Sequence, residues 1–570
     1  MSGSEANPVK ETKAQKTERL KQEKNAWEAL GEIREFARRG RDSVPEDWSL
    51  YFRWWGIYTQ GDGAGVVGGQ GGEGKSSPYF MLRAALPNGI VRSGQFRTLA
   101  DLAERHARGV ADITVRQNIQ LHWLTIESLP EVIDALKAAG ITTKGACGDV
   151  ARNITGCPLA GVDADEFYDA SPLVLEAAAA IRGRDEFKNL PRKFKVCLTG
   201  CRVWCSYPEI NDIALTAVER THRGKREVGF SVRVGGGLAA EPHFAVRLDA
   251  FVRPEQAVRV VRALTEIFRD ADMLRENRKR ARMKYLFLHF GWTAQKFLDE
   301  LNRRLGFELE PAAEETAPTD AFRDHVGIHP QKQEGLCYVG ASVLRGRITP
   351  EQMRSAADLA ERFGSGELRT TGMQNLVIIN VPKAKAEILA RELEFAGLPV
   401  SGSPFWRGAI ACTGTEFCKL AITETKGFTR WLVEELEGRI PGFDQPLKLH
   451  VTGCPNSCGQ HWIADIGLEG RKIRFDGKMV DGYSFWLGGA VGEHQSLARR
   501  INYHCVAQEV PEGIARLLAA YVAARRDNES LRAYFARFSE EELRAQLARA
   551  VEAGVRRDAA PGPVSQVAET

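Results

Sequence analysis

Four cysteines in the second half of the chain have the types and spacing of metal ligands. Cys412 and Cys418 form a C-x5-C pair, and after a gap of 35 residues Cys454 and Cys458 form a C-x3-C pair. Four thiolates from two separated loops can hold an iron–sulfur cluster. The alternatives are four buried thiols or zinc, although the spacing differs from the C-x2-C pairs that are common at zinc sites. We therefore predict a cluster at these four cysteines.

The residues around these cysteines point to a family. The segments Ala411-Cys-Thr-Gly-Thr-Glu-Phe-Cys-Lys-Leu-Ala and Val451-Thr-Gly-Cys-Pro-Asn-Ser-Cys resemble those of the siroheme-containing nitrite and sulfite reductases. In that family the four cysteines bind a 4Fe-4S cube, and the last of them also bridges to the siroheme iron. The resemblance implies that siroheme and the cluster are the cofactors, and that Cys458 is the residue they share.

The chain also contains an internal duplication. Asp101-Leu-Ala-Glu-Arg recurs as Asp358-Leu-Ala-Glu-Arg at an offset of 257 residues. Further on, Lys195-Val-Cys-Leu-Thr-Gly-Cys matches Lys448-Leu-His-Val-Thr-Gly-Cys at an offset of 253 residues. Two offsets that each hold over a long stretch predict a pseudo-twofold protein, with the functional site at the junction of the two halves.

Strand and helix patterns within each copy predict a fold that combines α+β and α/β parts. We expect two small ferredoxin-like half-domains and two larger α/β domains that hold siroheme and the cluster, as the family resemblance also implies. A helical pattern covers 517–552. The predicted units are an N-terminal tail and helix (1–48), a half-domain (49–145), an α/β domain (146–307), a linker (308–325), a half-domain (326–403), the cluster domain (404–552) and a tail (553–570).

Composition excludes several classes of protein. The 570 residues are 43% hydrophobic and 27% charged, and the net charge of +4 is too small to indicate nucleic-acid binding. No run of apolar residues is long enough to predict a membrane span. The polar segment 1–24 lacks the apolar stretch of a secretory signal, so we expect a solvated tail and a cytoplasmic protein. The odd number of cysteines, 11, favours thiols or metal ligands over disulfides.

Three segments resemble the substrate pocket of the reductase family. They are Thr114-Val-Arg-Gln-Asn, Val150-Ala-Arg-Asn-Ile and Leu190-Pro-Arg-Lys-Phe-Lys. Both candidate substrates, nitrite and sulfite, are small oxyanions whose reduction consumes many protons, so several cations should converge on them. For each residue alone the alternative is a surface salt bridge. The predicted catalytic residues are Arg116, Arg152, Lys193 and Lys195.

Siroheme carries eight carboxylates, so its pocket should be rich in arginine and lysine. The segment Arg278-Lys-Arg-Ala-Arg-Met-Lys-Tyr resembles a haem-contacting stretch of the family, and it gives Arg280, Arg282 and Lys284 as predicted contacts. A solvated basic helix face is the alternative. Gly235 and Gly236, which recur as a Gly-Gly pair in the second copy, are candidates for close backbone approach to the cofactor.

Several residues bear on the choice between the two substrates. Lys195 stands where nitrite reductases of the family usually carry asparagine and sulfite reductases carry lysine. Tyr58 and Cys147 look like a tyrosine and cysteine that are covalently linked beside the haem in some sulfite reductases, although Cys147 could simply be a buried thiol. The residues around Cys412 and Cys418 resemble those of the nitrite reductases instead. The sequence therefore leaves nitrite and sulfite equally open.

The resemblance implies ferredoxin as electron donor, because we find no flavin- or NADPH-binding segment. Such acidic donors dock on basic patches, and Arg499-Arg500 and the Lys-rich N-terminus are candidates. A cluster protein of cobalamin synthesis with the same duplicated fold, or a cluster-bearing redox sensor, is the alternative function. Cys201 and Cys205, counterparts of Cys454 and Cys458, suggest a vestige of the duplication with packed thiols, or a second cluster.

Overall fold

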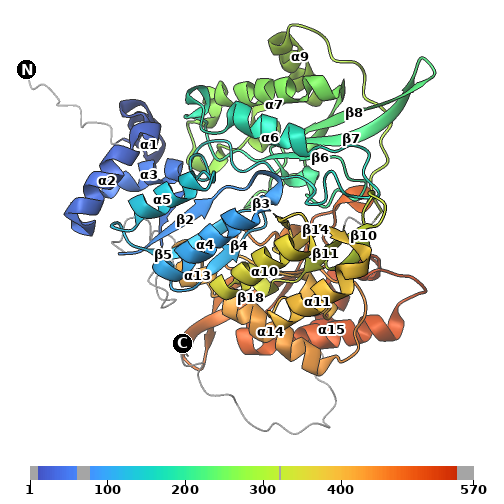
Figure 1. The fold of residues 1–570 in the computed structure, drawn as a ribbon. Helices are drawn as coiled ribbons and strands as arrows, with labels where there is room; N and C mark the ends of the chain where they lie inside the picture. Colours follow the sequence, from blue (N-terminus) through green and yellow to red (C-terminus); the bar gives the residue numbers. More distant parts are fainter. Residues whose placement is uncertain (1–10, 61–77, 320–321, 549–570) are drawn as a thin grey trace, which may run out of the picture.

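The computed structural model describes residues 11–60, 78–319 and 322–548. Two α/β domains lie at opposite ends of the molecule, and two smaller sheets lie between them (Figure 1). The predicted tail at 553–570 falls outside the described residues. None of the described helices combines the length and apolar character that crossing a membrane would require. The duplicated arrangement of half-domains and α/β domains predicted from the sequence is confirmed by this architecture.

Each half-domain is built on a five-stranded antiparallel sheet. The first sheet has the order β1 (Ile57–Thr59), β2 (Phe80–Ala84), β5 (Ile119–Leu124), β4 (Ala111–Ile113) and β12 (Arg347–Ile348). The second has the order β10 (Gly327–Pro330), β11 (Leu336–Ala341), β14 (Leu376–Pro382), β13 (Glu367–Thr370) and β3 (Ile90–Arg92). Their helices are α4 (Ser93–His106) and α5 (Leu129–Ala138) in the first copy, and α10 (Pro350–Phe363) and α11 (Ala386–Phe395) in the second.

The two half-domains exchange their edge strands. The short strand β3 leaves its own sheet and pairs with β13 of the second copy, while β12 pairs with β4 of the first. The helices that follow these strands, α4 and α10, pack side by side (Figure 1) and exchange matching ion pairs. Arg97 contacts Asp358 at 2.6 Å, and Arg354 contacts Asp101 at 2.8 Å, at the same 257-residue offset. A single hydrophobic core therefore runs through both half-domains.

Each of the two larger domains contains its own mixed sheet, with one parallel and one antiparallel part. In the first, β6 (Val196–Thr199) runs parallel to β7 (Ile213–His222), which continues antiparallel through β8 (Lys225–Val234) and β9 (Val246–Val252). In the second, β15 (Ala409–Ala411), β16 (Leu449–Thr452) and β17 (Ile466–Phe475) are parallel, and β18 (Lys478–Leu487) and β19 (Arg499–Val506) are antiparallel.

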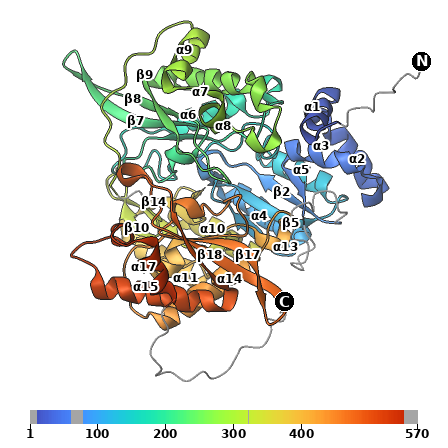
Figure 2. The ribbon, with the colours of Figure 1, turned by 180° about the vertical axis from the view of Figure 1, so that it is seen from behind.

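Helices cover these two sheets. The first domain contains α6 (Ser171–Ile181), α7 (Pro254–Arg269), α8 (Lys284–Phe290) and α9 (Ala294–Leu305). The second contains α12 (Pro404–Gly408), α13 (Gly414–Phe417), α14 (Lys426–Arg439), α15 (Val510–Ala524), α16 (Leu531–Ala536) and α17 (Glu540–Ala548). As far as residue 548, where the described residues end, the predicted helical region 517–552 consists of three helices. The first break occurs where Asn528 adopts a left-handed backbone (φ 57°) and Ser530 caps a new helix. Seen from behind, α13 of the second α/β domain lies beside β5 of the first half-domain (Figure 2), where the rings of Phe417 and His122 stack with their centroids 3.9 Å apart.

Residues 11–24, the part of the N-terminal segment that the structure describes, form a helix rather than the solvated tail that their polarity predicts. This helix is α1 (Lys13–Glu23), which is followed by α2 (Leu30–Arg39) and α3 (Ser49–Phe52). Lys21 of α1 is buried, contacts Glu18 at 2.6 Å and Asp149 at 3.5 Å, and donates a hydrogen bond to the Leu190 carbonyl at 3.1 Å. A buried carboxylate at Asp149 thus fixes a segment that composition alone assigns to solvent.

Candidate active site and cluster-binding loops

The four predicted cluster ligands lie in two loops at the carboxyl end of a parallel strand pair. β15 and β16 run side by side, with Ala411 opposite Val451. Cys412 follows β15 directly, and Cys454 comes two residues after β16. The backbone N–H of Cys412 donates to the Val451 carbonyl at 3.1 Å. Because parallel strands end at one edge of the sheet, the two cysteine loops are neighbours.

The surroundings of these thiols suit metal ligands. The Cys412 sulfur accepts a hydrogen bond from the backbone N–H of Gly453 at 3.2 Å, and the Cys454 sulfur accepts one from the Asn456 amide at 3.4 Å. Burial, together with the nearby charge of Cys458, raises the pKa of both Cys418 and Cys454 to about 12. The free thiols are therefore protonated at neutral pH, and a bound metal would hold them as thiolates.

Arg116 lies in the turn between β4 and β5 and reaches toward the first α/β domain. Its guanidinium donates to the Asn211 side chain at 2.8 Å and to the carbonyls of Asn153 and Val196 at 2.5 and 3.2 Å. Its buried Nε has no hydrogen-bond partner among the described residues. Burial lowers the pKa of Arg116 to about 10, so the group stays charged at neutral pH.

Lys193 and Lys195 lie just before β6, and an extended backbone directs side chains two residues apart to the same face. Within the described ranges, neither amino group has a hydrogen-bond or ion-pair partner. Burial lowers the pKa of Lys193 to about 8. Burial, followed by the charges of Arg282, Arg116 and Lys193, lowers the pKa of Lys195 well below its usual value. Such a group of buried cations, in which Lys193 and Lys195 have no ion-pair partner among the described residues, would suit an anion.

The pKa of Lys193, in the first repeat, is influenced by a residue of the second repeat. The largest influence on its pKa is burial, and the next is Cys458 of the second repeat, which opposes burial by favouring the charged amine. Such an influence needs proximity, because Coulomb interactions weaken with distance and with intervening solvent. The electrostatic influence of Cys458, the exposed cysteine of the cluster loop, thus extends from the second repeat to Lys193 of the first.

Arg152 is surrounded by the residues of the predicted cross-link. Its guanidinium donates to the Gly148 carbonyl at 2.9 Å and to the Tyr58 hydroxyl at 3.4 Å. Burial disfavours its charge, but Tyr58 and Cys147 outweigh burial and raise the pKa of Arg152. The buried Cys147 sulfur accepts a hydrogen bond from Arg83 at 2.9 Å. Arg152 thus contacts Tyr58 and is influenced electrostatically by Cys147, and a bond between Tyr58 and Cys147 stays a prediction.

The three predicted siroheme contacts differ in their surroundings. Arg282 is buried and donates two hydrogen bonds to Asp212, at 2.9 and 2.7 Å. Lys284 is buried as well, and its amino group donates to carbonyls of the turn at 237–238. Arg280 is half exposed, with 51% of its side chain open to solvent. Contact of these residues with siroheme stays a prediction.

Asp212 is a positioning residue that the sequence reasoning missed. Besides binding Arg282, its carboxylate accepts a hydrogen bond from the backbone N–H of Lys195 at 2.7 Å. The second repeat has the same bond, from Lys448 to Asp465, also at 2.7 Å. The recurrence of the aspartate at the 253-residue offset was the signal that could have identified it.

Protein packing by itself accounts for the glycines at 235 and 236. Gly235 has a left-handed backbone (φ 81°), and a Cβ there would lie 2.6 Å from the Phe287 ring. A Cβ on Gly236 would lie 2.3 Å from the Glu209 carbonyl oxygen. Both positions therefore exclude a side chain without any ligand, and their approach to a cofactor stays a prediction.

The charge balance of the pocket fits a polycarboxylate cofactor. The strongest electrostatic neighbours of Lys195 are the cations Arg282, Arg116 and Lys193, and the one carboxylate among them, Asp212, is already bound to Arg282. Buried positive charge that exceeds its counter-ions is costly, so a carboxylate-rich ligand would stabilise the pocket. The neighbouring cysteine loops supply the donor set of an iron–sulfur cluster.

Comparisons with known proteins agree with this site. The profile of the "Nitrite and sulphite reductase 4Fe-4S domain" matches residues 147–309 and 403–553, and that of the "Nitrite/Sulfite reductase ferredoxin-like half domain" matches residues 73–139 and 329–396. The structure of the Mycobacterium tuberculosis NirA protein superposes with a TM-score of 0.87 at 34% identity, covering 93% of this chain and 97% of that chain.

Two curated relatives are similar over nearly the whole chain. The assimilatory ferredoxin-dependent nitrite reductase of Haloferax mediterranei is 38% identical over 91% of both chains. The ferredoxin sulfite reductase 1 of Mycolicibacterium paratuberculosis is 37% identical over 89% of this chain and 92% of its own. The chain therefore belongs to the family of ferredoxin-dependent nitrite and sulfite reductases, oxidoreductases that carry siroheme and a 4Fe-4S cluster.

Proposed function

We propose that this enzyme reduces both sulfite and nitrite in the cytoplasm, and that sulfite is its preferred substrate. The relatives of both kinds match about equally well, at 38% and 37% identity, so identity does not distinguish the substrates. The supporting observation is the pair Lys193 and Lys195, whose amino groups have no ion-pair partner among the described residues and which influence each other's surroundings electrostatically. Sulfite is partly a dianion near neutral pH, whereas nitrite is a monoanion, so a second cation favours sulfite.

Each residue of the pocket has a proposed role toward the oxyanion. Arg116, fixed by carbonyls and Asn211, binds the anion with its remaining N–H. Arg152 supplies a second fixed positive charge. Lys193, with a pKa of about 8, can release and regain a proton near neutral pH and therefore suits proton delivery. Lys195 adds the charge that distinguishes a dianion from a monoanion.

The cofactors have proposed protein ligands as well. When bound, siroheme supplies an iron for the substrate and the cluster supplies electrons one at a time. Cys412, Cys418, Cys454 and Cys458 would hold the cluster, and Cys458 would also contact the siroheme iron. Siroheme carboxylates would be bound by Arg280, Arg282 and Lys284. At Gly235 and Gly236 the backbone would approach the cofactor closely. Arg282 has a second role, because through Asp212 it positions the backbone of Lys195.

We also propose that Tyr58 and Cys147 form a covalent link. Formation of a carbon–sulfur bond removes one hydrogen atom from the Tyr58 ring and one from the Cys147 thiol, and molecular oxygen would serve as the two-electron oxidant that takes up both as hydrogen peroxide. The pairing is supported by their common influence on Arg152, which contacts the Tyr58 hydroxyl and whose pKa is raised by both Tyr58 and Cys147. Mass spectrometry of the Tyr58 and Cys147 peptides should then find one cross-linked species that lacks two hydrogen atoms. Two separate unmodified peptides would contradict the link.

Ferredoxin is the electron donor of this family, and its docking face on this chain is a separate proposal. Arg500 is exposed. The guanidinium of Arg499 already donates a hydrogen bond to the Phe538 carbonyl at 2.9 Å. Lys21 of the N-terminal segment is buried and cannot contribute to a docking face. Among the residues predicted from the sequence, Arg500 and the exposed Lys13 and Lys16 of the N-terminal segment therefore fit a contact with an acidic donor.

The substrate preference is tested by steady-state kinetics of the purified enzyme. With reduced ferredoxin as donor, kcat/KM for sulfite should exceed kcat/KM for nitrite at neutral pH. A clear preference for nitrite would overturn the proposal and assign the enzyme to nitrite reduction.

A further inference from the structure

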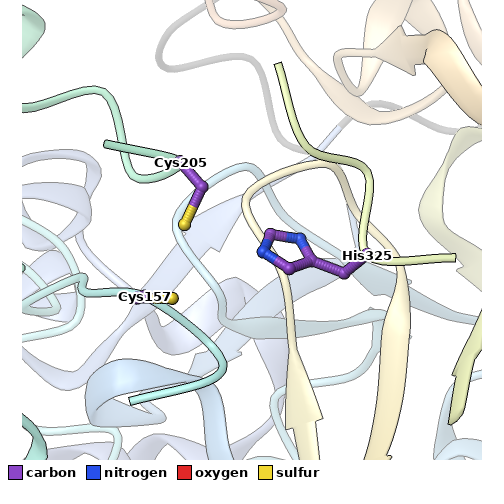
Figure 3. A group of neighbouring side chains, drawn as sticks. All are labelled: Cys157, Cys205 and His325. Atoms are coloured by element: carbon purple, nitrogen blue, oxygen red, sulfur yellow. The ribbon is translucent and has the colours of Figure 1, made fainter. Parts of the chain in front are cut away.

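A second group of metal-ligand residues lies in the first repeat, apart from the cluster loops. Cys157, Cys205 and His325 each place one ligand atom within 4.8 Å of the other two, and all three residues are buried. Figure 3 shows the two thiols and the imidazole converging from three separate loops. Cys201 adds a further thiol, whose sulfur lies 3.6 Å from that of Cys205 but outside the group of three, so it would move closer to complete a set of four ligands. The proposed reductase function uses none of these groups.

The spacing of the sulfurs fits a single ion better than a disulfide or a cube. A disulfide would place the Cys201 and Cys205 sulfurs about 2.05 Å apart. Two thiolates at about 2.3 Å from one tetrahedral zinc would lie about 3.8 Å apart, close to the observed 3.6 Å. A four-iron cube places each thiolate on a different metal atom, so it needs a wider set of ligands.

His325 has the burial and the hydrogen-bonding state expected of a metal ligand. Its backbone is left-handed (φ 64°), and its ring is 2% exposed. Neither ring nitrogen has a hydrogen-bond partner in the part of the chain that the structure describes. Leaving a buried polar group unsatisfied costs free energy, and a metal bond would remove that cost.

The thiols have the supporting hydrogen bonds expected around metal ligands. The Cys157 sulfur accepts one from the backbone N–H of Leu159 at 3.4 Å, and the Cys201 sulfur accepts one from the Thr199 hydroxyl at 3.4 Å. Such outer contacts orient ligands and stabilise thiolates.

The duplication explains how such a site would arise. Cys201 and Cys205 correspond to Cys454 and Cys458, and the loops share their shape, since Trp204 and its counterpart Ser457 are both left-handed (φ 53° and 52°). The counterparts of Cys412 and Cys418 are Thr155 and Gly161, which cannot complete a cluster. In the first repeat, Cys157 and His325 supply the two missing ligands from other positions.

We propose that Cys157, Cys201, Cys205 and His325 bind one zinc ion in a tetrahedral site. Four protein ligands leave no open position, which is typical of a structural ion. A pocket of about 300 Å³ includes His325, Arg323 and Tyr338 in its wall, so the histidine side of the site borders open space. The ion would connect His325, at the end of the linker, to the first α/β domain.

The proposal is tested by elemental analysis of the full-length enzyme with its cofactors bound. We expect stoichiometric zinc in addition to iron. His325→Ala and Cys157→Ala should each lower zinc at least tenfold while the siroheme absorbance remains. Cys505→Ser is the matched control, because Cys505 is a buried free thiol on β19 in the other α/β domain, and it should retain the zinc.

A second measurement does not depend on the folding of variants. Wild-type enzyme produced with cobalt in place of zinc should show the sulfur-to-cobalt charge-transfer and visible bands of a tetrahedral site. Wild-type enzyme without zinc, with mononuclear iron at these residues, or with a Cys201–Cys205 disulfide detected after alkylation of the denatured chain, would overturn the proposal.

Discussion

Arg282 and Asp212 form a buried, two-point ion pair that also controls the backbone of Lys195. The guanidinium donates to the two carboxylate oxygens at 2.9 and 2.7 Å, and one of these oxygens accepts the N–H of Lys195 at 2.7 Å. The pair therefore determines how the segment before β6 presents Lys193 and Lys195 to the junction of the repeats.

Asp212→Asn should destabilise the enzyme and disturb this segment. The substitution leaves the Arg282 charge buried without its partner, which typically costs about 3–5 kcal/mol. The measurement is denaturant unfolding of the purified variant. Asp134→Asn is the control, because it removes an exposed pair with Arg34 and should cost less than about 1 kcal/mol. Equal losses for the two variants would contradict the assigned role of Asp212.

Nitrite binding should weaken as the pH rises through about 8. Burial lowers the pKa of Lys193 to about 8, so its positive charge is present below that pH and is lost above it. Nitrite carries one negative charge throughout this pH range, so a change in its binding must come from titration of a protein group. The measurement is the nitrite KM as a function of pH. In Lys193→Arg the charge persists, and the profile should flatten. An unchanged profile in that variant would exclude Lys193 as the titrating group.

Asp149 should stabilise the N-terminal helix only while it is ionised. Burial opposes its charge, but Lys21, Arg278 and Arg192 outweigh burial and lower its pKa. A lowered pKa contributes stability above the unfolded value of about 3.9, and that contribution is lost as the pH falls through the folded value. Asp149→Asn should therefore cost about 3–5 kcal/mol at neutral pH. The deficit should shrink in acid unfolding experiments below about pH 4, and a deficit independent of pH would refute this account.

Each cysteine of the two cluster loops should be required for the cluster. Serine at position 412, 418, 454 or 458 removes a thiolate ligand, so acid-labile sulfide and cluster absorbance should fall to background. Cys505→Ser, which changes a buried thiol on β19, should leave both unchanged. Full sulfide content in any one of the four variants would remove that residue from the ligand set.

Much of the architecture could be predicted because it is repeated in the sequence. The offsets of 257 and 253 residues predict the duplication, and matched ion pairs such as Arg97–Asp358 and Arg354–Asp101 confirm it in the fold. The exchange of β3 and β12 could not be predicted, because strands of two or three residues carry too little pattern to reveal their partners.

Long-range burial accounts for the residues that sequence reasoning missed. Lys21 lies in a polar segment, and only its contact with Asp149 explains why that segment folds. His325 is a single histidine in the linker region, and nothing in its local sequence indicates that it meets Cys157 and Cys205. The family motifs led to Lys193 and Lys195, but the absence of counter-ions for them in the described residues becomes apparent only in the folded chain.

The most direct test of the account is the substrate preference of Lys195→Asn, measured as kcat/KM for sulfite and nitrite with reduced ferredoxin. Loss of a charge-assisted contact of about 1.5–3 kcal/mol should lower kcat/KM for sulfite by roughly ten- to hundredfold and change that for nitrite much less. Lys448→Asn, the pseudo-symmetric counterpart in the second repeat, should leave the ratio unchanged. A wild-type enzyme that already prefers nitrite, with a ratio that Lys195→Asn does not alter, would contradict the assignment of Lys195 as the charge that selects sulfite.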